Sequence, residues 1–234
     1  NQPAIEDKLP KIGRHVSPRV VNYGDGRALL VIRLSGMAFE SLSEDEIASR
    51  FNQRNRIIAA AAKSKGNRLA FWNTLQRRRI DFSSRFAFKS AFMQQFASDY
   101  LKRFTTGDYF ENIFHVAVLL RYDDLAEGVQ ELEDLGEQLT KALSSYDPEI
   151  LGTYQRNGIV FSDVYKYLGT IINGVEEEVP VMAAPAYELI PTSWFHFGYE
   201  IQEIRAENRT RFAVNYDMKD FPDTTKNGML DPIL

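Results

Sequence analysis

Three consecutive arginines, Arg77, Arg78 and Arg79, form the most concentrated group of side chains that could bind a partner. Guanidinium groups in a row can pair with carboxylates or phosphates of another molecule. The competing interpretation is a solubilising strand end, because the nearby Asp81 can neutralise part of the charge. The sequence predicts a partner-binding role for the three arginines and leaves this alternative open.

Trp194 and Phe195, followed closely by Phe197 and Tyr199, are a second candidate for partner binding. Large aromatic side chains gathered on a surface are typical of docking patches. The same residues could instead form the core of the last hairpin. Both interpretations stay open at this stage.

No residue pattern predicts catalysis or metal binding. His15, His115 and His196 are far apart and lack the spacing of zinc ligands. We interpret His115, which lies in an apolar run, as a hydrogen-bonded or edge-strand histidine. No G-x-S-x-G nucleophile turn occurs either. We therefore predict no catalytic, cofactor-binding or metal-ligating residue in this chain.

Carboxylates at helical spacing, Glu127, Glu131 and Asp134, could in principle do acid/base work. A regular row on the polar face of a helix is more often solvated surface, and we interpret it so. The sequence also lacks G-x-x-x-x-G-K-[ST], the loop whose backbone amides hold nucleotide phosphates.

Composition places the chain among ordinary globular proteins. It has 234 residues, 44% hydrophobic and 26% charged, with a net charge of −4. This charge gives no overall attraction to nucleic acid. Cysteine is absent, which suits a reducing cytoplasm. No apolar run approaches the roughly 20 residues of a membrane-spanning helix. We also expect the chain to be a piece of a longer protein, since it starts at Asn1 without a signal peptide.

Periodicity and turn signals define the elements that must position these residues. Ser43 with Glu46 forms a capping box, Ser83 or Ser84 can cap a later helix, and Asn157-Gly158 is a hairpin turn. We expect helices over 43–65, 83–105, 124–143 and 162–172. We expect strands at 19–23, 27–35, 68–79, 112–121, 150–155, 159–161, 195–206 and 211–217.

Five aromatic residues recur at every fourth position of the second expected helix: Phe88, Phe92, Phe96, Tyr100 and Phe104. Such a stripe marks one face of a helix. We interpret it as a core or partner-binding face rather than a cofactor site.

The order of elements predicts an α+β fold with two β-α-β units. We expect a ferredoxin-like split β-α-β sheet, with an extra helix between the halves and a C-terminal β-hairpin. The expected domain organisation is an extended arm over 1–18, a core domain over 19–175, a Pro-containing connector over 176–194, and a hairpin with the start of a following segment over 195–234.

Several short motifs follow one another in a characteristic order and spacing in the first part of the chain: Leu9-Pro10, Arg14-His15-Val16, Asp25-Gly26, Ile32-Arg33-Leu34, Gly36, Phe39-Glu40, Ser43 to Glu46, the arginines at 50, 54 and 56, and Arg77-Arg78-Arg79. In this order and spacing they resemble the opening of the VirB/TrbE/CagE family of type IV secretion and conjugation ATPases. The subfamily stays open and includes the Dot/Icm-like branch. The resemblance covers residues 9–79 best and then continues as element order alone. Lys11 departs from the aromatic residue that the family usually has after Leu-Pro.

The resemblance implies a non-catalytic N-terminal assembly domain. The partners it implies are other subunits of the same ATPase and inner-membrane components of the secretion system, with no direct nucleic-acid contact. ATP and Mg²⁺ would bind in a C-terminal domain outside this chain. The location it implies is the bacterial cytoplasm, peripheral to the inner membrane.

Two functions of other classes remain as alternatives. A ferredoxin-like sheet can present aromatic side chains to RNA bases, so an RNA-binding module is one. A stand-alone enzyme of unknown class is the other.

Overall fold

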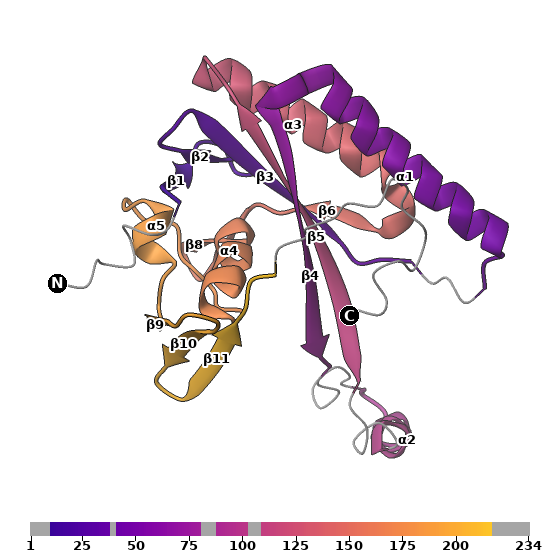
Figure 1. The fold of residues 1–234 in the computed structure, drawn as a ribbon. Helices are drawn as coiled ribbons and strands as arrows, with labels where there is room; N and C mark the ends of the chain where they lie inside the picture. The colour runs from indigo at the N-terminus through magenta and orange to yellow at the C-terminus, as the bar shows by residue number, and fades with distance from the viewer. Residues whose placement is uncertain (1–9, 38–40, 81–87, 103–108, 217–234) are drawn as a thin grey trace.

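The structure is a computed structural model, and it describes residues 10–37, 41–80, 88–102 and 109–216. Its main feature is a six-stranded antiparallel sheet with helices on both faces (Figure 1). The sheet runs in the order β1-β2-β3-β5-β4, and β6 pairs with β3 as well. Its strands are β1 (Ile12–His15), β2 (Val21–Tyr23), β3 (Arg27–Leu34), β4 (Leu69–Arg79), β5 (Phe110–Arg121) and β6 (Pro148–Ile150). The predicted α+β class is confirmed.

Two β-α-β units are present, and each is split by a strand of the other. The last strand of the second unit lies at 148–150 rather than at the predicted 150–155, and residues 153–162 form a separate hairpin. The first consists of β3, α1 (Glu44–Lys65) and β4, with β5 lying between its two strands. The second consists of β5, α3 (Leu125–Ala142) and β6, with β3 lying between its two strands. The helix α2 (Ala91–Leu101) connects the halves, where the sequence predicts an extra helix.

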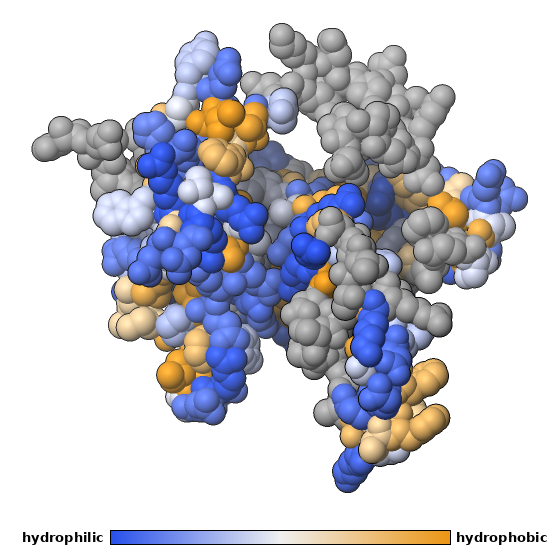
Figure 2. Space-filling view, turned by 90° about the horizontal axis from the view of Figure 1, so that it is seen from below, coloured by the Kyte–Doolittle hydropathy of each residue, from blue (hydrophilic) through white to orange (hydrophobic). Residues whose placement is uncertain are grey.

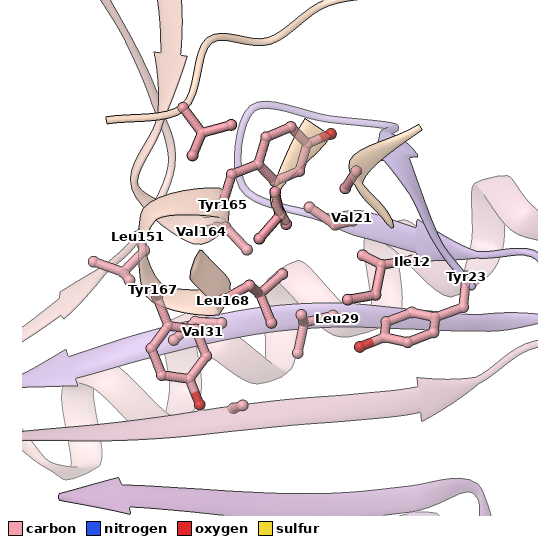
Figure 3. Packing of buried hydrophobic residues seen from close by; sticks show 14 of the residues in the cluster. Ile12, Val21, Tyr23, Leu29, Val31, Leu151, Val164, Tyr165, Tyr167 and Leu168 are labelled. Atoms are coloured by element: carbon pink, nitrogen blue, oxygen red, sulfur yellow. The ribbon is translucent and has the colours of Figure 1, made fainter. Parts of the chain in front are cut away.

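The centre of the sheet is buried on both faces, which explains why β3 and the second half of β5 are almost continuously apolar. On one face, Leu30 and Val118 pack with Leu132 and Leu139 of α3. On the other face, Leu29, Val31 and Leu119 pack beneath α4 (Asp163–Asn173) and α5 (Ala186–Leu189). Figure 3 shows this second layer, with Tyr167 and Leu168 of α4 lying toward the strands.

Side-chain caps fix where the helices begin. Ser43 and Glu46 form the predicted capping box at the start of α1. Asp124 caps α3, and Ser162 caps α4 as the sequence predicts. The predicted start of α2 is wrong, because Ser90 is its cap and accepts a hydrogen bond from the backbone N of Met93. Ser83 and Ser84 lie outside the described residues.

The C-terminal part forms two small sheets. The hairpin β7 (Thr153–Arg156) and β8 (Ile159–Ser162) turns at Asn157-Gly158, where both residues have positive φ, 52° and 78°. This is the turn that the sequence predicts. The last sheet has three strands rather than the two of the predicted hairpin: β9 (Trp194–Phe197), β10 (Gln202–Ala206) and β11 (Arg209–Ala213).

The segments predicted as an arm and a connector both contact the core. Ile12, in β1, is buried against the second face of the main sheet. From residues 176–194, Val179, Ala186 and Ile190 join the same cluster. Among the described residues, no helix is long and apolar enough to cross a membrane.

The ribbon formed by β4 and β5 continues beyond the helices that cover the centre of the sheet. Leu75 and Phe110, in its outer part, are 44% and 43% exposed. Figure 1 shows α2 at the outer end of this ribbon, away from α1, α3 and α4. The chain therefore presents α2 at a distance from its own core.

Candidate docking site

The three arginines divide between the two faces of the sheet, because successive residues of a strand point in opposite directions. The guanidinium of Arg77 lies 4.6 Å from the centre of the Phe110 ring, an arrangement typical of a cation–π contact. Arg79, two residues on, is exposed on the same face. Arg78 points to the opposite face. The sequence treats the triplet as one site, whereas the structure divides it.

Arg78 is engaged in ion pairs within the chain. Its guanidinium lies 2.7 Å from Glu111 on the neighbouring strand and 2.7 Å from Glu176, which follows α4. Glu176 also binds Lys166 of α4 at 2.7 Å. Burial alone would raise the pKa of Glu176, but Lys166 and Arg78 outweigh this and hold its pKa below the usual value. Arg78 thus fastens the ribbon to α4.

His115 lies beside this network in a cavity of about 50 Å³. Its ring packs 4.7 Å from the ring of Tyr167, and Nδ1 has no hydrogen-bond partner in the described part of the chain. Burial, with the nearby charge of Arg33, lowers the pKa of His115 to about 4. The edge-strand interpretation of His115 is wrong, because β5 lies between β3 and β4.

The predicted row of solvated carboxylates on α3 needs one correction. Glu131 is partly buried and binds Lys65 and Arg68, each at 2.7 Å. The hydrogen bond from Lys65 contributes most to holding the pKa of Glu131 below its usual value. Glu131 therefore ties the end of α1 to α3. Asp134 is exposed and accepts a hydrogen bond from Gln130 of the same helix, which fits the predicted surface role.

No group of three or more histidine, cysteine, aspartate or glutamate side chains is arranged to hold a metal ion within the described ranges.

Trp194 and Phe195 also point to opposite faces. Trp194 lies on the outer face of the three-stranded sheet and is 81% exposed. Phe195 faces inward, with its ring centre 6.5 Å from that of Phe197. The docking-patch interpretation therefore fits Trp194, and the interpretation as part of the core fits Phe195.

Phe195 borders an apolar cavity of about 270 Å³ between the two sheets. Its floor is a row of residues across the main sheet, from Tyr23 to Trp72. The side chains of α4 form one wall and the inner face of β9–β11 forms another. Gln202 contributes an amide, and the rest of the lining is mostly aliphatic and aromatic: Pro10, Ile12, Leu29, Ala117, Leu119, Tyr167, Leu168, Ile171, Ile172, Phe195, Phe197, Ile204 and Ala213.

The mouth of this cavity is hydrophobic too. Trp72, Ile171 and Phe197 line the cavity and are 56%, 48% and 55% exposed. Figure 2 shows hydrophobic atoms interrupting the hydrophilic surface in several separate patches. Sequence reasoning missed this cavity, because its lining comes from eight strands and one helix spread over residues 10–213.

The aromatic stripe of α2 forms a second apolar surface. Phe92, Phe96 and Tyr100 are 75%, 60% and 53% exposed. Phe88 and Met93, at 41% each, extend the patch. Of the two roles predicted for the stripe, the core role is wrong for these residues. Phe104 lies outside the described residues.

Two family models match the chain. The model described as type IV secretion system ATPase VirB4/TrbE, N-terminal domain, matches residues 19–126. The model described as CagE, TrbE, VirB family, component of type IV transporter system, matches residues 149–234. The chain belongs to the VirB4/TrbE family. The structure places both matches around one shared sheet, since β6 at 148–150 pairs with β3.

Curated relatives resemble this VirB4/TrbE chain over nearly its whole length. The type IV secretion system protein virB4 of Bartonella henselae is 26% identical over 98% of the chain and 32% of its own length. The protein of the same name from Brucella suis is 26% identical over 94% of the chain and 29% of its own length. Protein virB4 of Agrobacterium fabrum is 25% identical over 97% of the chain and 31% of its own length. The chain spans about a third of the length of these relatives.

The candidate surfaces fall within the regions that the VirB4/TrbE models match. The arginine triplet and α2 lie inside the first match, and Trp194 with Phe195 lies inside the second. The apolar cavity takes residues from both, for example Trp72 and Phe197. The cavity therefore forms only where the two matched regions pack against each other.

Proposed function

We propose that this chain is a non-catalytic assembly and docking region of a type IV secretion ATPase. Its partners in this proposal are other subunits of the same ATPase and inner-membrane components of the secretion system. Its place is the bacterial cytoplasm, peripheral to the inner membrane. The match to a model described as the N-terminal domain of such an ATPase supports the setting.

The observation that carries the proposal is the exposure of the α2 stripe. Leaving Phe92, Phe96 and Tyr100 in water is unfavourable by roughly 25 cal/mol per Å² of apolar surface. Contiguous apolar surface of this kind marks interaction sites on soluble proteins. The position of α2 at the end of the β4–β5 ribbon makes it accessible to a large partner.

The non-catalytic part of the proposal rests on the residues themselves. The sequence contains no G-x-x-x-x-G-K-[ST], so this chain supplies no phosphate loop for a nucleotide. Arg78 carries the kind of cation that binds phosphate, but it is paired with Glu111 and Glu176. In the proposal, ATP and Mg²⁺ bind to parts of the protein outside this chain.

Replacing the three aromatic residues in the full-length protein tests the proposal. A Phe92→Ser, Phe96→Ser, Tyr100→Ser variant should be recovered several-fold less with the inner-membrane fraction of cells that carry the secretion system. Nucleotide binding by the purified variant should be unchanged. A Gln95→Ser, Ser98→Ala variant, altered on the polar side of α2, is the matched control. Equal recovery of the aromatic variant and the control would refute the docking role.

A further inference from the structure

We propose that the apolar cavity between the two sheets receives Phe92 and Phe96 of α2 from a second copy of this chain. This inference deepens the proposed assembly role and rests on it. It assigns a donor surface, α2, and an acceptor surface, the cavity lined by Trp72, Ile171 and Phe197, to every copy.

The cavity and the helix match in size. A dry cavity of about 150 Å³ is large enough to bind benzene. At about 270 Å³, the cavity has room for roughly two phenyl rings. Among the described residues of the stripe, Phe92 and Phe96 are the two most exposed, and their i, i+4 spacing brings the rings together on one side of the helix.

The two surfaces also match in chemistry. The cavity is lined almost entirely by carbon, with Gln202 contributing an amide. A phenyl ring has no hydrogen-bonding group, so it leaves no buried polar atom unpaired when it enters such a site. Trp72 and Phe197 at the mouth can pack edge-to-face against incoming rings.

A single copy cannot easily make this contact with itself. Trp72 marks the cavity, and the ribbon runs seven residues further to Arg79 before the connection to α2 begins. At about 3.3 Å per strand residue, that is roughly 23 Å. Figure 1 shows α2 beyond the end of the ribbon, apart from α4 and β9–β11. The ribbon therefore holds the helix out toward a neighbouring molecule.

The area involved favours assemblies in which both surfaces are used. An aromatic side chain has on the order of 200 Å² of surface, so the exposed parts of Phe88, Phe92, Phe96 and Tyr100 amount to roughly 450 Å². A stable interface buries about 800 Å² on each partner. One contact between α2 and a cavity supplies about half of this area. A copy whose α2 enters one neighbour and whose cavity holds the α2 of another buries both of its apolar surfaces. Unlike surfaces of this kind allow reciprocal exchange between two copies or closure into a ring.

Site-specific photocross-linking in the full-length protein tests the inference. Phe96 is replaced by p-benzoylphenylalanine, an aromatic residue that links covalently to neighbouring C–H groups under light. We expect a covalent dimer, with the cross-link mapped by mass spectrometry to the cavity lining near Trp72, Ile171 or Phe197. The same replacement at Gln95, a polar residue of α2 beside the aromatic stripe, should give several-fold less dimer.

A cavity-filling variant supplies the second arm. Ala213→Trp places a large side chain into the acceptor site and leaves α2 intact. Combined with the cross-linker at Phe96, it should reduce the dimer at least fivefold, while circular dichroism and the unfolding midpoint confirm that the protein still folds. Should Ala213→Trp fail to fold, Ile171→Trp at the rim replaces it.

The other outcomes separate this inference from the proposed function. A cross-link from Phe96 to another protein of the membrane complex would overturn the inference and support the docking role. A cross-link within one copy, or equal dimer from Phe96 and Gln95, would also overturn it. A cross-link to lipid would overturn it in favour of a membrane-binding helix.

Discussion

Arg78 donates to Glu176 across 98 positions of sequence, with 2.7 Å between guanidinium nitrogen and carboxylate oxygen. The contact joins the outer part of the β4–β5 ribbon to the residues that follow α4. Because Glu176 also binds Lys166, the ribbon, α4 and the next segment meet at one carboxylate.

Removing this contact should lower stability modestly. We expect Arg78→Ala to reduce the free energy of unfolding by about 1 kcal/mol, since the ion pairs are partly exposed and solvent screening limits their strength. Urea denaturation gives the change. Arg77→Ala, which removes an exposed cation on the other face, should cost less. If the two variants are equally stable, the network does not brace the ribbon. A cycle with Glu176→Gln isolates the pairwise contribution.

The buried imidazole of His115 should make stability depend on pH. Burial, with Arg33 nearby, lowers its pKa to about 4 in the folded state, against 6.5 for a free histidine. The unfolded chain therefore binds the proton more readily. The free energy of unfolding is therefore at its full value above about pH 6.5. It decreases as the pH falls toward 4, by at most about 1.4 kcal/mol per pH unit.

His115→Phe checks this assignment, because it keeps a ring against Tyr167 without a titrating group. Unfolding midpoints measured between pH 7 and 5 should fall steeply in the original protein and less steeply in the variant. Glu176 has a lowered pKa, so its contribution is lost at lower pH. Parallel curves for the two proteins would contradict the assignment.

Two helical glycines should respond in opposite ways to alanine. A Cβ at Gly128 of α3 would overlap with Cβ of Tyr122, and the backbone would have to move. We expect Gly128→Ala to destabilise the protein by about 1–3 kcal/mol. At Gly169 of α4, the nearest atom would be Ile190 Cγ2 at 3.7 Å, an ordinary contact. Gly169→Ala should stabilise by up to about 1 kcal/mol through helix propensity.

The unfolding temperatures of Gly128→Ala and Gly169→Ala, measured against the original protein, test whether the two changes have opposite signs. Destabilisation by both would mean that the space around α4 is tighter than the structure places it.

The neighbours Trp194 and Phe195 should separate a surface role from a packing role. Phe195→Ala should lower stability by about 1–2 kcal/mol, because its ring lies between the sheets. Trp194→Ala should leave stability within about 0.5 kcal/mol, as expected for an exposed side chain. Denaturant titration measures both. A large loss of stability in Trp194→Ala would mean that its ring packs within the folded chain.

Local signals predicted much of the fold. The capping box at Ser43 and the turn at Asn157-Gly158 depend on residues close in sequence, and both are present. The start of α2 was harder, because several serines precede it. Ser90 takes the cap, and Phe88 is held outside the helix by a hydrogen bond from its backbone N to Gln94 Oε1.

The candidate site was only partly predictable, for reasons of strand geometry and distance in sequence. Adjacent residues in a strand face opposite sides, so Arg77 and Arg78 enter different environments although they look equivalent in sequence. The contact of Arg78 with Glu176 and the cavity beside Phe197 both require parts of the chain far apart in sequence to meet. Periodicity within one helix or strand contains no information about contacts between residues that are far apart in sequence.

The RNA-binding alternative loses its main structural basis. Modules that bind RNA on a ferredoxin-like sheet use an open face with exposed aromatic residues. Here the centre of the sheet is covered on both faces, and Leu29 and Leu30 are each 1% exposed or less. Salt-sensitive RNA binding by the purified protein would revive that alternative.

The pairing of β3 with β5 has a consequence for synthesis on the ribosome. β2 precedes β3 in the chain and pairs with it at Ala28 and Leu29, but the other edge of β3 pairs with β5, from Arg27↔Arg121 to Leu34↔Phe114. That edge gains its partner only after about 80 further residues have been made. At 5–20 residues per second, this takes roughly 4–16 s. During that time the apolar strand β3 has an open edge, and open apolar edges are prone to aggregation. We expect the nascent chain to need chaperone protection until β5 has emerged.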